Sequence, residues 1–293
     1  FIFANMSGAA ATAQHDTETY YYDTDDAYNF YLELWGGEHC HVGIYAPNPE
    51  PTPECCMKAS DVALEKLMEL CTPALQGGGK RAMDMGAAYG GCARALHKKF
   101  GCKVVCIELS KRENEVNIQR NQEEKLEDQI LVPGELSFDD TKEPSESVDC
   151  CVSEDSILHA GKGRPAVVAE AARVLKKGGY FVFSDIMQRD AVDPANLNRV
   201  YARLGLEDMG SPAKYIEWAA QAGMRLKRYE DFSSDIASHY GTIKKMLEGP
   251  IRDKLRGKVS DAYVESMIEG LGAWVDASNA GNLAWGFFVF EKM

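Results

Sequence analysis

The sequence of 293 residues lacks any run of the roughly 18 to 20 apolar residues that a helix needs to cross a bilayer. Its opening segment, Phe1 to Asn5, is too short for the apolar core of a secretory signal. We therefore predict a protein of the cytoplasm. Because Phe1 is not an initiator residue and Met6 follows closely, these first residues are left out of the fold prediction, and a missing upstream leader stays an open alternative.

Positive charge is also scarce. The chain has 32 Lys and Arg against 45 Asp and Glu, and its formal net charge is -13 at pH 7. Such a chain on average repels nucleic-acid phosphates and anionic membrane surfaces. We predict a small diffusible ligand and neither a nucleic acid nor a membrane as partner, with a monomer and a homodimer both open.

The nine cysteines lack the spacing of a small disulfide framework, and their number is odd. Five lie in apolar surroundings typical of a protein core, which indicates reduced, buried thiols: Cys92, Cys102, Cys106, Cys150 and Cys151. A metal site is not predicted at His39, Cys40 and His41. Adjacent side chains cannot all converge on one ion, and no companion ligand pair has suitable spacing.

Strand and helix patterns alternate after the glycines at 77–79. We predict strands at 81–85, 103–109, 129–132, 148–152, 180–185, 225–232 and 285–291. Helices are predicted at 91–99, 111–126 and 164–175, the last ending at Lys176-Lys177-Gly178-Gly179. This alternation is typical of an α/β fold with a doubly wound, mostly parallel sheet, here of seven strands.

The predicted organisation has three parts. Residues 1–18 form a flexible tail, 19–75 an aromatic-rich helical lid, and 76–293 the α/β domain. Two stretches near 190–220 and 235–280 are predicted to be helical insertions over the carboxyl edge of the sheet, where ligands of such folds bind. They are the predicted substrate cap, and the sequence has no internal repeat.

A run of small residues, Asp84-Met85-Gly86-Ala87-Ala88-Tyr89-Gly90-Gly91, follows the first predicted strand. Such a turn lets backbone N–H groups approach a ligand at a helix N-terminus, although an ordinary glycine turn explains the run alone equally well. The second strand ends near Glu108, 22 residues after Gly86, where a carboxylate can accept both hydroxyls of a ribose. The combination fits a dinucleotide or an adenosyl cofactor.

A family resemblance separates these two. The run from Asp84 to Gly91 resembles the D-x-G-x-G-x-G motif of class I S-adenosylmethionine-dependent methyltransferases, with Ala88 in place of the middle glycine. Leu175-Lys176-Lys177-Gly178-Gly179 is similar to the L-K-P-G-G turn before the fifth strand of that family, with Lys177 in place of proline. The resemblance implies a Rossmann-like fold, S-adenosylmethionine as cofactor and S-adenosylhomocysteine as product.

From Tyr22 onward the chain most resembles the sarcosine/dimethylglycine N-methyltransferases and their glycine-methylating relatives. Four segments carry this resemblance: 29–31 with 35–45, 153–159, 208–212 and 283–286. The chain departs from the family in having Glu108 for Asn, Glu154 for Gln, and Asp185-Ile186-Met187 for Asp-Pro-Met. These departures bear more on the acceptor than on the cofactor.

The resemblance implies methylation of the amine nitrogen of sarcosine or dimethylglycine or both, leading to the osmolyte glycine betaine, with glycine as a further candidate. A phosphoethanolamine or thioether-acid methyltransferase is the alternative enzyme, and an inactive sensor that binds S-adenosylmethionine is the alternative of another class. Phosphate recognition would require clustered Lys or Arg in the cap, which the sequence does not convincingly show.

Cofactor-binding positions follow from the resemblance. Gly86 and Gly90 are expected at the methionine moiety, Glu108 with Leu109 at the ribose, and Glu135 with Leu136 at the adenine. The full predicted set is Tyr22, Trp35, Gly86, Ala88, Gly90, Glu108, Leu109, Glu135, Leu136 and Glu154.

Catalysis is assigned to His159 and Tyr22, which match a histidine–tyrosine pair of the related phosphoethanolamine methyltransferases. An ammonium ~4 Å from the sulfonium meets roughly 4 kcal/mol of repulsion, which lowers its pKa by about 3 units and eases proton transfer to a histidine. Arg203 is predicted to bind the substrate carboxylate, with Tyr31 and His159 beside the substrate. Alternatively, His159 bonds only to backbone and Arg203 is a solvated helix residue.

Overall fold

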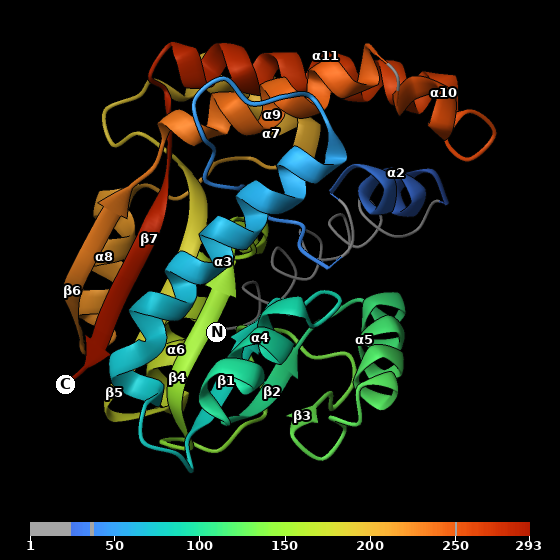
Figure 1. Cartoon of the computed structure of the whole chain (residues 1–293). Coiled ribbons are helices and arrows are strands. Elements are labelled where there is room, and N and C mark those ends of the chain that lie inside the picture. The colour runs from blue at the N-terminus through green and yellow to red at the C-terminus, as the bar shows by residue number, and fades with distance from the viewer. Residues whose placement is uncertain (1–24, 36–37, 250) are drawn as a thin grey trace, which may run out of the picture. The chain divides into compact units, whose positions relative to one another are not determined.

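A computed structural model of the chain describes residues 25–35, 38–249 and 251–293 (Figure 1). Among these residues, seven strands form one sheet in the order β3-β2-β1-β4-β5-β7-β6. The strands are β1 Arg81–Met85, β2 Lys103–Ile107, β3 Ile130–Leu131, β4 Val148–Glu154, β5 Leu175–Gln188, β6 Met224–Asp231 and β7 Leu283–Lys292.

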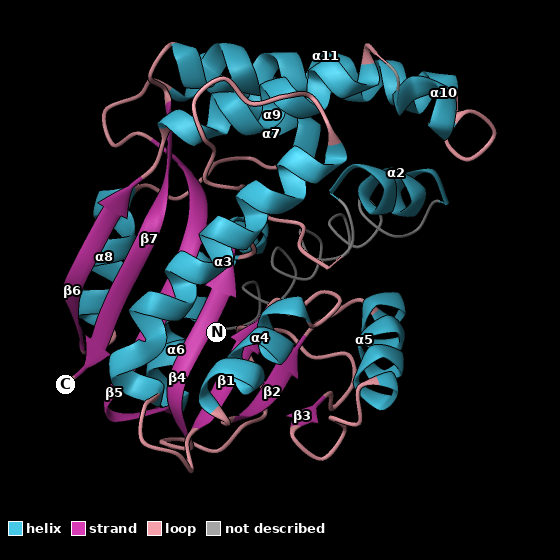
Figure 2. Cartoon of the chain, viewed as in Figure 1, coloured by secondary structure: helices cyan, strands magenta, loops and turns pink. Residues whose placement is uncertain are grey.

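The sheet is mostly parallel, as predicted. β1 pairs in parallel with both β2 and β4, and the same holds for β2 with β3 and β4 with β5. The arrow of β7 points opposite to those of its neighbours (Figure 2). The chain therefore leaves the parallel pattern only near its end.

The largest difference from a predicted boundary is at the start of β5, while other strand and helix ends differ by at most three residues. β5 begins at Leu175, so the predicted turn at Lys176-Lys177-Gly178-Gly179 lies inside the strand as an irregularity. Val148 pairs with Leu175 but Cys150 pairs with Tyr180, and Gly178 takes the positive φ of 74° that this detour requires. The Lys-Lys-Gly-Gly sequence predicted a turn, but it did not predict that strand pairing continues on both sides of that turn.

Helices alternate with the strands. They are α2 Asp25–Trp35, α3 Pro53–Leu75, α4 Gly91–Phe100, α5 Lys111–Glu123, η1 Ile157–Gly163, α6 Arg164–Val174, η2 Pro194–Leu197, α7 Asn198–Leu204, α8 Pro212–Gln221, α9 Ser234–Leu247, α10 Ile251–Leu255 and α11 Asp261–Asn279. Side-chain caps begin α5, η2 and α11, because Ser110 accepts the Glu113 N–H, Asp193 accepts the Ala195 N–H and Ser260 accepts the Tyr263 N–H. No helix among the described residues is long and apolar enough to cross a membrane.

The chain divides into two compact units. The helical unit comprises the described residues of 1–63, 186–211 and 231–285, and the sheet unit those of 64–185, 212–230 and 286–293. In the helical unit α11 packs against α9 and α7. In the sheet unit α4 packs on β1 and β2, while α6 packs against α8 on the other face of the sheet (Figure 1). The predicted domain boundaries themselves stay a prediction.

The core of the sheet unit is aromatic toward β5 and β7. Phe183 stacks on Phe288 and Phe290 with ring centroids 5.0 and 6.0 Å apart, and all three rings are buried. All nine cysteines are free thiols, and only Cys40 and Cys55 are not fully buried.

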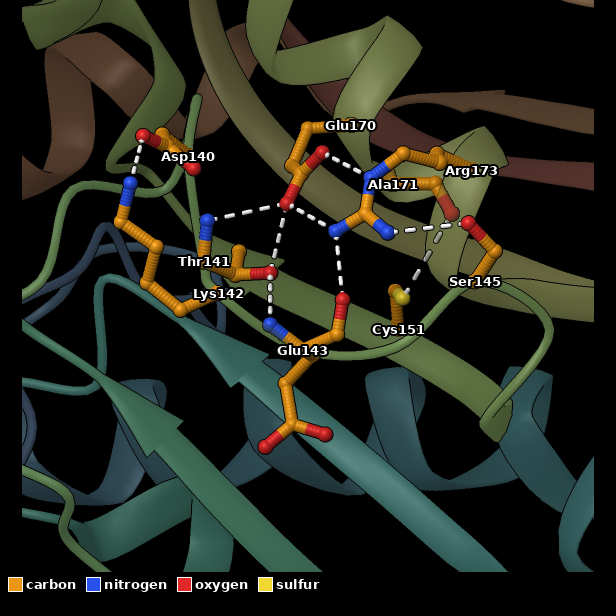
Figure 3. Close-up of polar contacts among 9 residues, drawn as sticks. All are labelled: Asp140, Thr141, Lys142, Glu143, Ser145, Cys151, Glu170, Ala171 and Arg173. Atoms are coloured by element: carbon orange, nitrogen blue, oxygen red, sulfur yellow. Dashed lines mark hydrogen bonds and ion pairs between the residues drawn. The ribbon is translucent and has the colours of Figure 1, made fainter.

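The segment between β3 and β4 is held to α6 by Glu170 (Figure 3). Its carboxylate accepts the Thr141 N–H at 2.9 Å and the Thr141 hydroxyl at 2.6 Å. Arg173 donates Nε and Nη2 to the same carboxylate at 2.6 and 2.7 Å. This buried acid thus fixes the chain on its way from the end of β3 back into the sheet.

Candidate active site

Two glycines in the left-handed region shape the turn after β1. Gly86 has φ 83° and Gly90 has φ 78°. A Cβ on Gly86 would lie 2.5 Å from the Ser156 side chain, and a Cβ on Gly90 would lie 2.0 Å from Oδ1 of Asn117. Both glycines are therefore required by backbone conformation and by local packing. Ala88, the predicted replacement for the middle glycine, also takes a positive φ of 43°.

The turn is tied to the end of β2 through Glu108. Its Oε2 accepts the Ala88 N–H at 3.1 Å, and its Oε1 accepts the Ser110 N–H at 2.9 Å. Burial raises the pKa of Glu108 above its usual value, opposed by the N–H groups of Ser110, Ala88 and Leu109. A carboxylate at this edge of the sheet is the group that accepts ribose hydroxyls in nucleotide-binding folds of this kind. The carboxylate therefore fits the predicted adenosyl group.

The predicted adenine residues lie next to the predicted ribose residue. Glu108 and Glu135 form a parallel bridge, and the Leu136 N–H donates to the Glu108 carbonyl oxygen at 3.0 Å. Nδ2 of Asn114, on α5, donates to the same oxygen at 3.0 Å. Backbone pairing across the edge of the sheet thus brings these positions together.

Asp84 adds a further carboxyl group to those of Glu108 and Glu135 at this edge of the sheet, and it was not predicted as a site residue. Asp84 on β1 is buried, and its pKa is raised to about 8 by burial first and then by the charges of Glu154 and Glu108. Glu154, a predicted cofactor residue, is half-buried at the end of β4. The sequence could have predicted Asp84 as a site residue, because Asp84 is the first position of the D-x-G motif and therefore lies on the strand that leads into the glycine turn.

His159 lies in η1, the turn of 3-10 helix that follows β4, and is half-buried. Its backbone N–H donates to the Ser156 carbonyl oxygen at 3.1 Å. The sheet unit therefore carries His159 and every predicted cofactor residue except Tyr22 and Trp35. Tyr22 lies outside the described residues.

In the helical unit, Arg203 is held against aromatic rings. Its guanidinium carbon lies 5.2 Å from the centroid of Tyr240 and 5.6 Å from that of Trp274. The stem passes Gly270, where an added Cβ would lie 2.9 Å from Cδ of Arg203. Arg203 is half-buried in this position, which differs from a side chain extended into solvent.

The other predicted residues of the helical unit also lie among aromatic rings. Tyr31 and Trp35 on α2 are buried with centroids 4.9 Å apart, and Trp35 lies 5.5 Å from the ring of His239. His239 is buried, and Tyr45 Oη lies 2.9 Å from its Nδ1. Burial first, and then electrostatic interaction with His41 and Arg203, lowers the pKa of His239 to about 3. The sequence offered no signal for this neutral histidine.

Comparison with known proteins identifies the class of this fold and site. Residues 83–183 match the methyltransferase domain family. A protein of Halorhodospira halochloris named sarcosine/dimethylglycine N-methyltransferase is 37% identical over 277 residues, covering 94% of this chain and 96% of its own. One of the same name from Aphanothece halophytica is 37% identical over 287 residues, covering 98% and 100%.

A solved structure from Galdieria sulphuraria, assigned by name as a sarcosine dimethylglycine methyltransferase, superimposes with a TM-score of 0.84 at 32% identity, covering 93% of this chain and 98% of its own. Together with the glycine turn and Glu108, these similarities show that the chain is an S-adenosylmethionine-dependent methyltransferase with the class I fold. More narrowly, it belongs to the sarcosine/dimethylglycine N-methyltransferase family. The predicted fold, enzyme class and cofactor are thereby confirmed.

Proposed function

We propose that this enzyme methylates the amine nitrogen of sarcosine and dimethylglycine, leading to glycine betaine. The observation that carries the proposal is the 37% identity over 94% of the chain to a relative that bears the name of this activity. Both acceptors are small amino acids with one amine and one carboxylate. The enzyme must therefore bind a carboxylate and receive a proton from an ammonium.

The cofactor role of the sheet unit follows from its polar groups. S-adenosylmethionine, when bound, supplies a methyl group on a positively charged sulfur. Glu108 with Leu109 would hold the ribose and Glu135 with Leu136 would flank the adenine. The turn of Gly86, Ala88 and Gly90 would hold the methionine moiety, with Glu154, Trp35 and Tyr22 as further contacts. The two N–H groups that orient the Glu108 carboxylate support this assignment.

Arg203 would bind the acceptor's carboxylate. A guanidinium whose faces lie against Tyr240 and Trp274 presents its N–H donors at its edges, where a carboxylate accepts two parallel hydrogen bonds. Tyr31 and Trp35 offer aromatic rings that suit a methylated ammonium through cation–π contact. Nε1 of Trp35 is buried without a hydrogen-bond partner among the described residues, so this ring also has a donor to offer.

His159 would act as the base, with Tyr22 as its partner. An ammonium has no lone pair, so the acceptor must lose a proton before its nitrogen can be methylated. An imidazole titrates near neutral pH and can take that proton. We further propose that the enzyme works as a monomer or homodimer in the cytoplasm, a reducing compartment that suits nine free thiols.

The test begins with calorimetric titration of S-adenosylmethionine into the wild-type protein. Release of S-adenosylhomocysteine is then measured with glycine, sarcosine, dimethylglycine, phosphoethanolamine and a thioether acid, with mass detection of each product. We expect turnover of sarcosine or dimethylglycine and mass gains in whole methyl groups. Preference for phosphoethanolamine would refute the proposed substrate, and cofactor binding without turnover of any acceptor would favour the sensor.

A further inference from the structure

The turn that carries His159 has an unusual N-terminal cap. The cap position of η1 is Ser156, whose side chain makes no capping bond and instead bonds to the carbonyl oxygen of Glu154 at 3.0 Å. The first N–H groups of a helix have no partner within the helix and require another acceptor. In η1 the N–H of Leu158 finds this acceptor in Oδ1 of Asp185, at 3.1 Å. The cap therefore comes from a side chain of β5 rather than from the turn itself.

Both backbone groups of Leu158 are held by side chains from other elements. Besides the N–H bound by Asp185, the carbonyl oxygen accepts Nη1 of Arg164 at 3.0 Å. Within η1, Gly161 leaves the helical region with φ 53° and ψ -127°, so the turn has little regular helix to hold its own shape. Leu158 immediately precedes His159, so these two bonds determine where the backbone of His159 lies.

Asp185 is itself held in place from a second direction. The hydroxyl of Tyr215, on α8, donates to Oδ2, so each oxygen of the carboxylate has a separate donor. The Tyr215 ring is buried and packs edge-on against Trp218 with centroids 5.2 Å apart. Burial first, and then the charge of Asp155, raises the pKa of Asp185 to about 8, opposed by the Tyr215 hydroxyl, the Leu158 N–H and the charge of Arg164. This carboxyl group is fully buried and accepts two hydrogen bonds, so it can hold the backbone of η1 in place.

We propose that Asp185 and Tyr215 are positioning residues for His159, holding η1 so that the imidazole is presented in its reactive orientation. The inference rests on the proposed function, in which His159 takes the acceptor's proton. The chain Tyr215–Asp185–Leu158 connects α8, β5 and η1 within the sheet unit, and it ends one residue before the base. A small displacement of a catalytic group is enough to lower turnover strongly without altering cofactor binding.

A double-mutant cycle tests the proposal in the full-length enzyme. Tyr215→Phe removes the hydroxyl and keeps the ring, and Asp185→Asn keeps the shape but replaces one carboxyl oxygen with an NH₂ group. We expect each to lower kcat about 10-fold, and to leave the Kd of S-adenosylmethionine within about 2-fold. In a His159→Ala background the same changes should lower kcat by less than about 2-fold, because the residue they position is gone. Equal losses in both backgrounds would show a merely structural role.

A second measurement needs no turnover. The imidazole signals of His159, identified by their loss in His159→Ala, are followed by NMR through a pH titration. We expect Tyr215→Phe to shift the His159 titration and to leave that of His97 unchanged, since His97 bonds to the Cys102 carbonyl oxygen elsewhere in the sheet unit. Unchanged His159 signals would overturn the proposal. If wild-type enzyme turns over none of the five acceptors, the proposed function fails while this measurement still decides the positioning role.

The matched control is Thr141→Val. It also removes a buried hydroxyl that donates to a carboxylate, that of Glu170. Among the described residues this carboxylate makes its hydrogen bonds to Thr141 and Arg173 rather than to η1, and it holds the segment before β4. We expect Thr141→Val to lower stability while kcat stays within about 2-fold of wild type. A loss of kcat as large as that of Tyr215→Phe would mean that any buried deletion in this unit harms catalysis, and would overturn the assignment to Asp185.

Discussion

Glu170→Gln tests how the segment before β4 is held (Figure 3). The carboxylate accepts four hydrogen bonds, two from Arg173 and two from Thr141. Arg173 also donates to the Glu143 carbonyl oxygen and the Ser145 hydroxyl, at 2.7 and 3.1 Å, so it joins the segment to α6 at a second place. Glutamine has the same shape, but its NH₂ group must face either Arg173 or Thr141, both of which are donors.

The expected loss of stability can be worked from these contacts. At the least, the bond from Arg173 Nε to Oε2 is lost, because the other three bonds all reach Oε1 and remain when the NH₂ group replaces Oε2. A bond to a charged group contributes about 1.5 to 3 kcal/mol when buried. Solvent reaches the Arg173 side chain, which is 39% exposed, so its share must be reduced to roughly 1 kcal/mol. The two Thr141 bonds then reach a neutral oxygen and weaken by roughly 1 kcal/mol together. The total is about 2 kcal/mol, or a fall in Tm of roughly 3 °C for a chain of this size.

The effect should depend on pH with a defined sign. Although burial raises it, the pKa of Glu170 ends below its ordinary value because Arg173 and Thr141 favour the charged form. Its contribution is therefore complete above the ordinary glutamate pKa of about 4.3 and is lost as pH falls through the lower folded value. We expect the difference in Tm between wild type and Glu170→Gln to be largest near neutral pH and to shrink in acid.

Thermal unfolding followed by circular dichroism at a series of pH values measures this difference. Lys142→Ala is the control, because Lys142 and Asp140 form an exposed pair with 66% and 62% of their side chains accessible. It should change stability by less than about 0.5 kcal/mol at any pH. The reasoning is refuted if Glu170→Gln melts with wild type at neutral pH, or if its deficit is as large in acid as at neutrality.

Three further substitutions separate the proposed roles. Glu108→Ala should raise the calorimetric Kd of S-adenosylmethionine roughly 10- to 100-fold, because hydrogen bonds to a charged acceptor are lost. The kcat at saturating cofactor should change much less. An unchanged Kd would show that Glu108 does not bind the ribose. Gly270→Ala should displace the Arg203 stem and raise the acceptor KM at least about 5-fold with cofactor Kd unchanged, and an unchanged KM would count against Arg203 as the carboxylate partner. Tyr45→Phe should cost about 1 to 2 kcal/mol in urea unfolding. Because the pKa of His239 is about 3, that loss should not vary between about pH 6 and 8, and variation there would contradict a neutral His239.

Some of the fold could be predicted because its causes are local. β1 occupies the predicted residues 81–85, and α4 begins at the predicted Gly91, since short-range hydrophobic patterns and glycine turns determine both. Glu108 was predicted from its place after β2 and does lie against Ala88 of the turn. The start of β5 was predicted five residues late, because its first pairing, Val148 with Leu175, depends on a strand distant in the sequence.

The sequence by itself determined the order of strands and helices, the glycine turn beside an acidic strand end, and the membership of a methyltransferase family. Only the tertiary structure decided that Asp185 caps the turn of His159, that Arg203 lies against Tyr240 and Trp274, and that His239 is neutral. The physical reason is the range of the interactions. Periodicity and turn chemistry act over a few neighbouring residues, whereas burial and these contacts depend on segments that are brought together only when the chain folds.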